Sequence, residues 1–295
     1  MHIGAVFPHT EIGSDPMVIR DYAQALEDMG LAHLIAYDEM LQSDPDAVEV
    51  NDIMMYYTIK HTFHEPLVLF GYLAGVTKKL GFATSVLILT ARQTGLVAKQ
   101  AAEVDILSRG RLRLGIGLGW NTFAYRALGE AFNDRGKRSE EQIAVLRALW
   151  TQKAINFTGK WHEFTHLGIN PTPVQRPIPI WLGGMASQVL ERTGRLADGW
   201  FPDTTEPPDA AFEEKLARVR EAARKAGREP KSIGVEGRLT AAKRTIDQLT
   251  AEAEAWRRLD ASHISLDTMN AGLRSVDEHI KLLRRFAEAT KDLRS

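Results

Sequence analysis

The chain contains no cysteine among its 295 residues, and this absence removes several kinds of chemistry at once. Disulfide frameworks, zinc or iron–sulfur centres held by cysteine, and thiol catalysis are excluded. A surplus of basic residues is also missing, because 37 Lys and Arg stand against 38 Asp and Glu, for a formal net charge of -1. Proteins that bind nucleic acids usually carry a strongly basic surface, so no nucleic-acid partner is expected.

Long apolar runs are missing too. No stretch approaches the roughly 20 apolar residues that span a bilayer. Residues 1–8 have neither the basic flank nor the cleavage site of a signal peptide. With 44% hydrophobic residues the chain can still bury a large core. We therefore expect a globular, cytoplasmic protein with no membrane partner.

Short apolar segments alternate with helical patterns along the whole chain. Buried strands are expected at residues 3–7, 33–37, 80–86, 111–116, 178–182, 199–201, 232–239 and 261–266. Eight strands alternating with helices predict an α/β fold, a single (β/α)8 TIM barrel over residues 1–295. It has an excursion after the second strand, at 38–65, and an insertion before the fifth, at 151–177. An open doubly wound sheet is the alternative, but the glycine fingerprint it needs is absent after the first strand.

In such a barrel the chemistry lies at the carboxyl ends of the strands. The candidates are therefore His9, Asp38, Glu39, residues 85–90, 117–121 and 183–185, Pro202, Asp203, Arg238 and Asp267. Asp38 and Glu39 are adjacent and would point in opposite directions in an extended segment, so they make poor joint metal ligands. His61 and His64 lack a carboxylate at the helical spacing of a metallohydrolase. No bound metal is expected.

Two glycine-rich segments follow predicted strands. Gly183 and Gly184 lie between a strand and the start of a helix, where free N–H groups and the helix dipole favour an anion such as phosphate. The alternative is a tight turn that binds nothing. Gly115, Gly117 and Gly119 would share one face and leave room at the barrel mouth for a flat ring. The alternative for these is a bulge that the curvature of the barrel requires.

Taken together, these segments resemble the luciferase-like monooxygenase superfamily, which contains FMN-dependent monooxygenases and reductases that use the deazaflavin F420. The resemblance is carried, in this order, by residues 80–86, 98–102 with 105–111, 114–120, 179–184 and 197–200. Residues 117–121 together with 182–184 look like the F420-dependent subgroup. The resemblance implies that Ser85 and Val86 form a bulge behind the cofactor ring. It also implies that Gly183, Gly184 and Met185 receive the cofactor phosphate.

The same resemblance leaves the proton donor open. Many relatives carry Asp-His after the second strand and use the histidine as an acid or base, whereas this chain has Asp38-Glu39. His9, His61 or His64 could take that role, and no spacing selects one of them. Asn121 matches a position that often faces the ring or the substrate. The candidate catalytic residues are therefore Asn121, Asp38, Glu39 and His9.

The resemblance implies an oxidoreductase that transfers a hydride between F420 and a small organic substrate. The alternatives are an FMN-dependent monooxygenase served by a separate flavin reductase, and a barrel that binds flavin without turnover. A phosphate-binding lyase or isomerase would need a lysine or an acid–base pair at a strand end, and no lysine occurs at any of these ends.

Two expectations concern larger features. The excursion and the insertion are both expected at the mouth, as a lid or a substrate wall, with Tyr56, Tyr57, Phe63, Phe157 and Trp161 suggesting an apolar substrate. A homodimer is expected because the helices near 67–77 and 96–108 are apolar on more than one face. The residues concerned are Leu67, Leu69, Phe70, Leu73, Ala98, Ala101 and Ala102. Relatives also commonly pair through this region.

Overall fold

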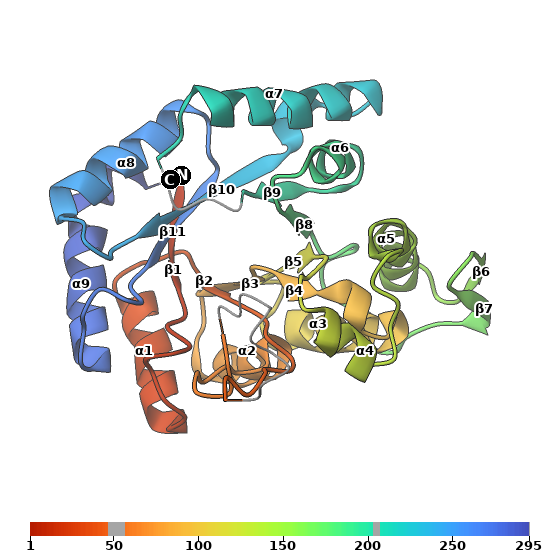
Figure 1. Cartoon of the computed structure of the whole chain (residues 1–295), viewed down its shortest axis with the longest axis horizontal. Coiled ribbons are helices and arrows are strands. Elements are labelled where there is room, and N and C mark those ends of the chain that lie inside the picture. The colour runs from red at the N-terminus through yellow and green to blue at the C-terminus, as the bar shows by residue number, and fades with distance from the viewer. Residues whose placement is uncertain (47–56, 203–206, 295) are drawn as a thin grey trace.

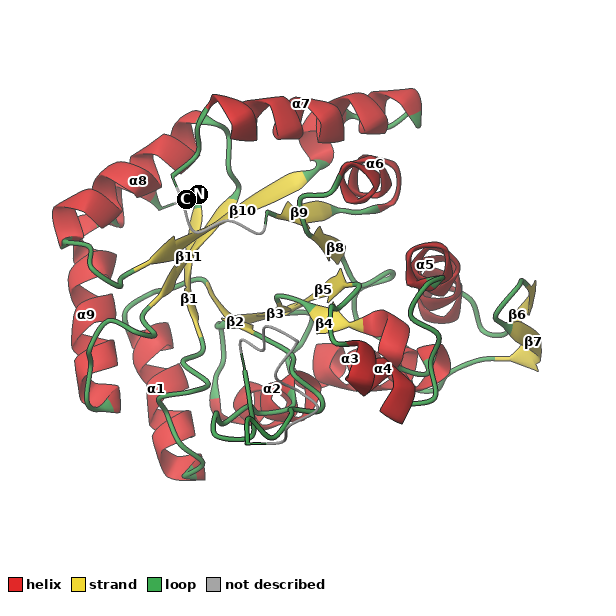
Figure 2. Ribbon diagram, in the orientation of Figure 1, coloured by secondary structure: helices red, strands yellow, loops and turns green. Residues whose placement is uncertain are grey.

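The computed structural model describes residues 1–46, 57–202 and 207–294, and within them eight parallel strands form a closed ring (Figure 1). The strands are β1 (His2–Val6), β2 (His33–Ala36), β3 (Gly81–Thr84), β5 (Leu112–Gly117), β8 (Ile180–Gly183), β9 (Gly199–Phe201), β10 (Gly234–Thr240) and β11 (His263–Asp267). They are neighbours in the order β3-β2-β1-β11-β10-β9-β8-β5, and pairing between β3 and β5 closes the ring (Figure 2). The predicted (β/α)8 barrel is confirmed.

Helices surround this ring on its outside (Figure 2). They are α1 (Pro16–Asp28), α2 (Pro66–Val76), α3 (Thr94–Leu107), α4 (Thr122–Ala127), α5 (Arg135–Thr151), α6 (Ser187–Leu196), α7 (Ala210–Lys225), α8 (Ile246–Arg258) and α9 (Val276–Ala289). Side chains cap the first turns of α1 and α2: that of Asp15 accepts a hydrogen bond from Met17 N, and that of Glu65 accepts one from Val68 N. Across the described ranges, no helix combines the length and apolarity that a membrane span requires.

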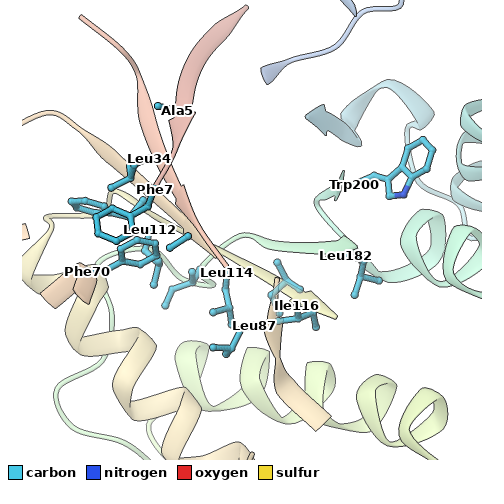
Figure 3. Close-up of a cluster of buried hydrophobic side chains, with 14 of the residues drawn as sticks. Ala5, Phe7, Leu34, Phe70, Leu87, Leu112, Leu114, Ile116, Leu182 and Trp200 are labelled. Atoms are coloured by element: carbon cyan, nitrogen blue, oxygen red, sulfur yellow. The ribbon is translucent and has the colours of Figure 1, made fainter. Parts of the chain in front are cut away.

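The main core lies between the strands and the helices. On β5 the alternate residues Leu112, Leu114 and Ile116 point outward into it, where Phe70 from α2 joins them (Figure 3). All of the residues that were expected to form a dimer face are buried in this layer: Leu67, Leu69, Phe70, Leu73, Ala98, Ala101 and Ala102. That reason for a homodimer is therefore wrong, since these apolar residues are already buried inside a single barrel.

Side chains also fill the barrel interior. Near the amino ends of the strands, the buried carboxylate of Glu236 accepts a hydrogen bond from Arg113 Nη1 at 2.8 Å and lies 2.6 Å from His33 Nε2. Above it an apolar layer contains Val6, Ile35, Ala83, Trp181, Phe201 and Met269. The guanidinium of Arg113 lies 4.6 Å from the centre of the Trp181 ring, where the two layers meet. Since side chains of the described residues fill the interior here, we expect a ligand to enter at the mouth, above the apolar layer.

The insertion forms a β-hairpin, with strands β6 (Ile155–Thr158) and β7 (Glu163–Leu167). Its expected position at the mouth is wrong. It leaves the carboxyl end of α5 and leads to the start of β8, and it lies outside α5, away from the ring (Figure 1). Glu141 on α5 holds it there by accepting hydrogen bonds from Lys160 N at 2.9 Å and Trp161 N at 2.8 Å. Phe157 and Trp161 therefore do not line the mouth.

Candidate active site

A bulge enters the mouth directly after β3. Ser85 and Val86 separate β3 from the short strand β4 (Leu87–Ile88), and the peptide bond that joins them is cis. Ser85 N donates a hydrogen bond to Ala36 O at 2.8 Å, which keeps the bulge attached to the end of β2. Val86 packs on the apolar layer of the interior. A bulge thus lies where the resemblance anticipates one.

Gly117 and Gly183 lie on either side of Val86. A Cβ atom added at Gly183 would come within 2.6 Å of Val86 Cγ1, and one added at Gly117 would collide with Val86 Cγ2. These glycines therefore make room for Val86, and the space expected to stay open for a flat ring is filled by protein. Gly119 lies beyond β5 with φ 67°, and its missing side chain faces Ile88, so it does not share a face with Gly117. Val86 is thus the surface at this side of the mouth.

The loop between β8 and α6, which was expected to receive a phosphate, makes hydrogen bonds that change which N–H groups are available as donors. Gly184 has φ 122°, a conformation that favours glycine. Its N–H donates to Phe201 O at 3.1 Å, and its carbonyl accepts from Trp200 Nε1 at 2.9 Å. The N–H of Gly184 is therefore already used. Ala186, the N-cap of α6, has no side chain to cap the helix, so the first-turn N–H groups after Met185 are the better donors.

Asp38 and Glu39, adjacent at the end of β2, have different partners. Asp38 Oδ1 accepts a hydrogen bond from Arg92 Nη2 at 2.8 Å, and its Oδ2 accepts one from Ile88 N at 2.8 Å. Burial raises the pKa of Asp38, although the charge of Arg92 opposes this. Asp38 therefore holds the end of β2 against β4, with both of its oxygens occupied.

Glu39 is the carboxyl group at the mouth that suits proton transfer. Burial and the negative charge of Asp38 raise the pKa of Glu39 to about 7, although a hydrogen bond with the side chain of Asn121 acts in the opposite direction. Near neutral pH this side chain therefore exists in both its acidic and its basic form. A general acid or base works best when its pKa is close to the pH at which the enzyme operates.

Asn121 lies beside Glu39 and also begins α4. Its Oδ1 accepts hydrogen bonds from Phe123 N and Ala124 N, each at 3.1 Å, and its Nδ2 donates to Leu41 O at 3.3 Å. The side chain is nearly fully buried. Asn121 is thus a helix cap and a neighbour of Glu39, and its expected contact with the ring or the substrate stays a prediction.

The candidate histidines are less suited to proton transfer than Glu39, because their ring nitrogens have partners within the protein. His9 is fully buried, stacked on Phe63 with ring centres 4.9 Å apart, and its Nε2 accepts a hydrogen bond from Tyr37 N at 3.1 Å. Burial, with a smaller contribution from His64, lowers the pKa of His9 to about 3. His61 Nδ1 accepts from Thr58 N at 3.1 Å, within the excursion. In the described ranges, no three His, Asp or Glu side chains group in a way that could hold a metal ion.

A polar group between the ends of β2 and β11 contains Asp267 and Arg238, which the sequence named as candidates, together with Tyr37, which it did not. Tyr37 Oη donates a hydrogen bond to Asp267 Oδ2 at 3.0 Å, and the guanidinium of Arg238 lies 5.7 Å from the centre of the Tyr37 ring. Burial and the charge of Asp267 raise the pKa of Tyr57, with a further contribution from Glu39. Strand alternation could have found Tyr37, since residues 33, 35 and 37 point to the interior. Asp203 and Tyr56 lie outside the described residues.

Such a mouth defines a (β/α)8 barrel with a bulge at Ser85 and Val86, a helix start without a side-chain cap, and one carboxyl group whose pKa is raised to about 7. The chain belongs to the luciferase-like monooxygenase family, whose model matches residues 2–292.

Relatives with assigned activities use two cofactors. The F420-dependent hydroxymycolic acid dehydrogenase of Mycobacterium tuberculosis is 30% identical over 258 residues, 86% of this chain and 66% of that protein. The FMNH(2)-dependent dimethylsulfone monooxygenase of Pseudomonas putida is 32% identical over 142 residues, 47% of this chain and 39% of that protein. The fold matches an F420-dependent secondary alcohol dehydrogenase with a TM-score of 0.80 and 16% identity, over 98% of each chain. Like its relatives, the chain is an oxidoreductase.

Proposed function

We propose that the protein uses F420 to transfer a hydride to or from a small organic substrate that carries a hydroxyl or carbonyl group. The observation that carries the proposal is Glu39, a half-buried carboxyl group at the mouth whose pKa is raised to about 7 by burial and by Asp38. The relative that acts on hydroxymycolic acid is F420-dependent and aligns over most of this chain, which supports both the cofactor and the hydroxyl group.

The residues of the mouth fit a flavin-type cofactor. Val86 offers an apolar surface for one face of a flat ring, and Ser85 and Gly117 border it. Gly183, Gly184 and Met185 lead into the first turn of α6, whose uncapped N–H groups would bind the phosphate. When bound, F420 supplies a ring carbon that accepts or returns a hydride.

Glu39 supplies the matching proton transfer. Oxidation of an alcohol to a carbonyl compound releases a hydride from carbon and a proton from oxygen. The carboxylate form of Glu39 takes this proton, and its acid form returns it in the reverse direction. Asn121 orients the carboxyl group through their hydrogen bond, while Asp38 is committed to Arg92 and Ile88. His9 is excluded from this role by its burial and by a pKa lowered to about 3.

An FMN-dependent monooxygenase is the second candidate. The dimethylsulfone enzyme supports it, because it is as similar in identity although it aligns over a smaller share of the chain. Such an enzyme would need O2 and a separate flavin reductase to supply reduced FMN. The same phosphate loop and the same Val86 surface would serve this cofactor.

Cofactor binding and turnover separate the two candidates. F420 and FMN are each titrated into the purified protein and followed by fluorescence, and alcohols are then tested with the cofactor that binds. We expect F420 to bind more tightly and to be reduced by an alcohol, with a rate that rises with pH through about 7. Glu39→Gln should keep cofactor affinity and lose most of this rate, about a hundredfold. Tight FMN binding without F420 binding would overturn the proposal in favour of the monooxygenase.

A further inference from the structure

A pocket of about 490 Å³ lies beside the mouth, between the end of β2, the start of α2 and the first half of α3. We call it the outer pocket. Its apolar lining consists of Met40, Phe63, Ala91, Leu96, Val97 and Leu128. The volume is within the range of small-molecule sites, roughly 300–1,000 Å³. Leu96 and Leu128 remain well exposed at its rim, at 54% and 40%.

Most carboxyl groups that line the outer pocket have a basic partner. Arg92 pairs with Asp38 at 2.8 Å and with Glu65 at 3.1 Å. The carboxylate of Glu130 lies 3.5 Å from Arg138 Nη1. Among the described residues this leaves Glu39 as the one carboxyl group in the pocket that forms no ion pair. An anion would meet four carboxyl groups and a single arginine that already has two partners, and a cation would find three of the four carboxylates paired.

Glu39 connects the outer pocket with the mouth. It lines the pocket, and burial and the charge of Asp267 at the end of β11, together with the charge of Glu39, raise the pKa of Tyr57. Phe63 lines the pocket and contacts Tyr57, with ring centres 4.6 Å apart. A molecule whose reacting group lies at Glu39 therefore has the pocket as the space for the rest of its length.

We propose that the outer pocket binds the uncharged, apolar chain of the substrate, whose hydroxyl or carbonyl group lies at Glu39. This rests on the proposed role of Glu39 in proton transfer. Burial of methylene groups against the apolar lining supplies affinity, and the carboxyl groups, which outnumber the arginine in the lining, repel an anionic chain. The pocket thus selects an elongated secondary alcohol over a short or an anionic one.

Two measurements on the full-length protein test this. The first is the dissociation constant of straight-chain secondary alcohols, from 2-butanol to 2-decanol, measured by calorimetry. The second is kcat/KM for the same series with the bound cofactor. Affinity should rise about two- to fourfold for each added methylene until the pocket is full. The variant with both Leu96→Gln and Leu128→Gln should flatten this rise and weaken octanol binding about tenfold. Leu107→Gln, at the exposed far end of α3 and outside the pocket, is the matched control and should keep the rise.

The possible outcomes distinguish failure of the pocket proposal from failure of the proposed alcohol oxidation. Chain-length-dependent binding that the double variant flattens, without turnover of any alcohol, keeps the pocket and overturns alcohol oxidation. Turnover that does not depend on chain length, or octanol binding unchanged in the double variant, overturns the pocket and leaves the role of Glu39 intact. Tighter binding of an alkylammonium ion of equal length would also overturn it, since the paired carboxylates would then be acting as a cation site.

Discussion

Arg92 Nη2 donates a hydrogen bond to Asp38 Oδ1 at 2.8 Å, and this pair joins the end of β2 to the turn that precedes α3. The side chain of Asp38 is 1% exposed and that of Arg92 is 15% exposed, so little solvent screens the pair. The relationship fixes a negative charge next to Glu39. That charge is one of the two causes that raise the pKa of Glu39, after burial.

The first prediction follows from this charge. Asp38→Asn keeps the shape of the side chain and removes its charge, so the pKa of Glu39 should fall. Because the carboxylate of Glu39 is the active form in alcohol oxidation, the acid limb of the rate profile should move to lower pH. Stability should decrease by about 2–4 kcal/mol, since Arg92 loses a buried partner. Rates measured from pH 5 to 9 and urea unfolding would check both effects.

Glu65→Gln is the matched control for Asp38→Asn. It removes the other carboxylate partner of Arg92, at 3.1 Å, without changing the charge of the residue adjacent to Glu39. Its acid limb should stay at the position of the unmodified enzyme. An acid limb that moves equally in both variants would show that the net charge of the pocket, and not Asp38, sets the pKa of Glu39.

The second prediction concerns Asn121. Its side chain accepts two hydrogen bonds from the first turn of α4, so Asn121→Ala should cost about 1 kcal/mol of stability. Its hydrogen bond to Glu39 lowers the pKa of that group, so the same variant should move the acid limb to higher pH. Asn121→Ser retains a cap and should recover most of the stability but not the original acid limb. Recovery of both would make Asn121 a helix cap alone.

The fold could be predicted from the sequence because its signals are local. The apolar run at residues 33–37 and the helical pattern after Pro66 are readable within a few residues of chain, and eight such alternations allow few architectures. The error at the hairpin concerned its sideways position. The segment runs along the outside of the helices, where Trp161 Nε1 donates to Asp134 at the start of α5 and His162 contacts Thr94 at the start of α3, so these two helices separate it from the mouth.

The site was less predictable because its contacts join distant segments. Tyr37 and Asp267 are 230 residues apart, and no pattern within either strand indicates their hydrogen bond. Gly183 looked like an open position because the sequence does not show that Val86 fills the space beside it. The raised pKa of Glu39 depends on burial, which exists only in the folded chain. Their positions after predicted strands made both Glu39 and His9 candidates, but the sequence could not show which of them has a pKa suited to proton transfer.

The third prediction is the homodimer, on different residues from those first considered. On α2 the side chains of Val68 and Tyr72 are 70% and 39% exposed, and Gly71 and Gly75 have open space where a side chain would be. This small-residue face can receive a second helix closely. We expect a dimer in sedimentation at micromolar concentration, and Val68→Lys should shift it to monomer. Val174→Lys changes an equally apolar, exposed residue elsewhere and should leave the dimer intact.

The fourth prediction tests Val86 as a surface for the cofactor. Gly117→Ala would collide with Val86 and push it from its place on the apolar layer, so cofactor affinity should fall about tenfold or more. The double variant Gly117→Ala with Val86→Ala removes the collision and should restore part of the affinity. Fluorescence titration of the cofactor measures both. Affinity unchanged in Gly117→Ala would mean that Val86 does not contact the cofactor.

The last prediction concerns the pH dependence of stability and uses His9. In the folded protein its pKa is lowered to about 3 by burial, with His64 adding to the effect. In the unfolded chain a histidine has a pKa of about 6.5. Between these values the unfolded state binds the extra proton, so His9 stabilises the fold fully above about pH 6.5 and loses this contribution as the pH falls toward 3. The loss should be about 1.4 kcal/mol per pH unit, or about 2 kcal/mol at pH 5. His9→Gln should be less stable at pH 7 but should lose less stability on acidification. His166→Gln, on the exposed hairpin, provides the control in urea unfolding at pH 7, 6 and 5. If His9→Gln and the control show the same dependence on pH, His9 takes up its proton in the folded state, and its burial does not have the effect on the pKa described above.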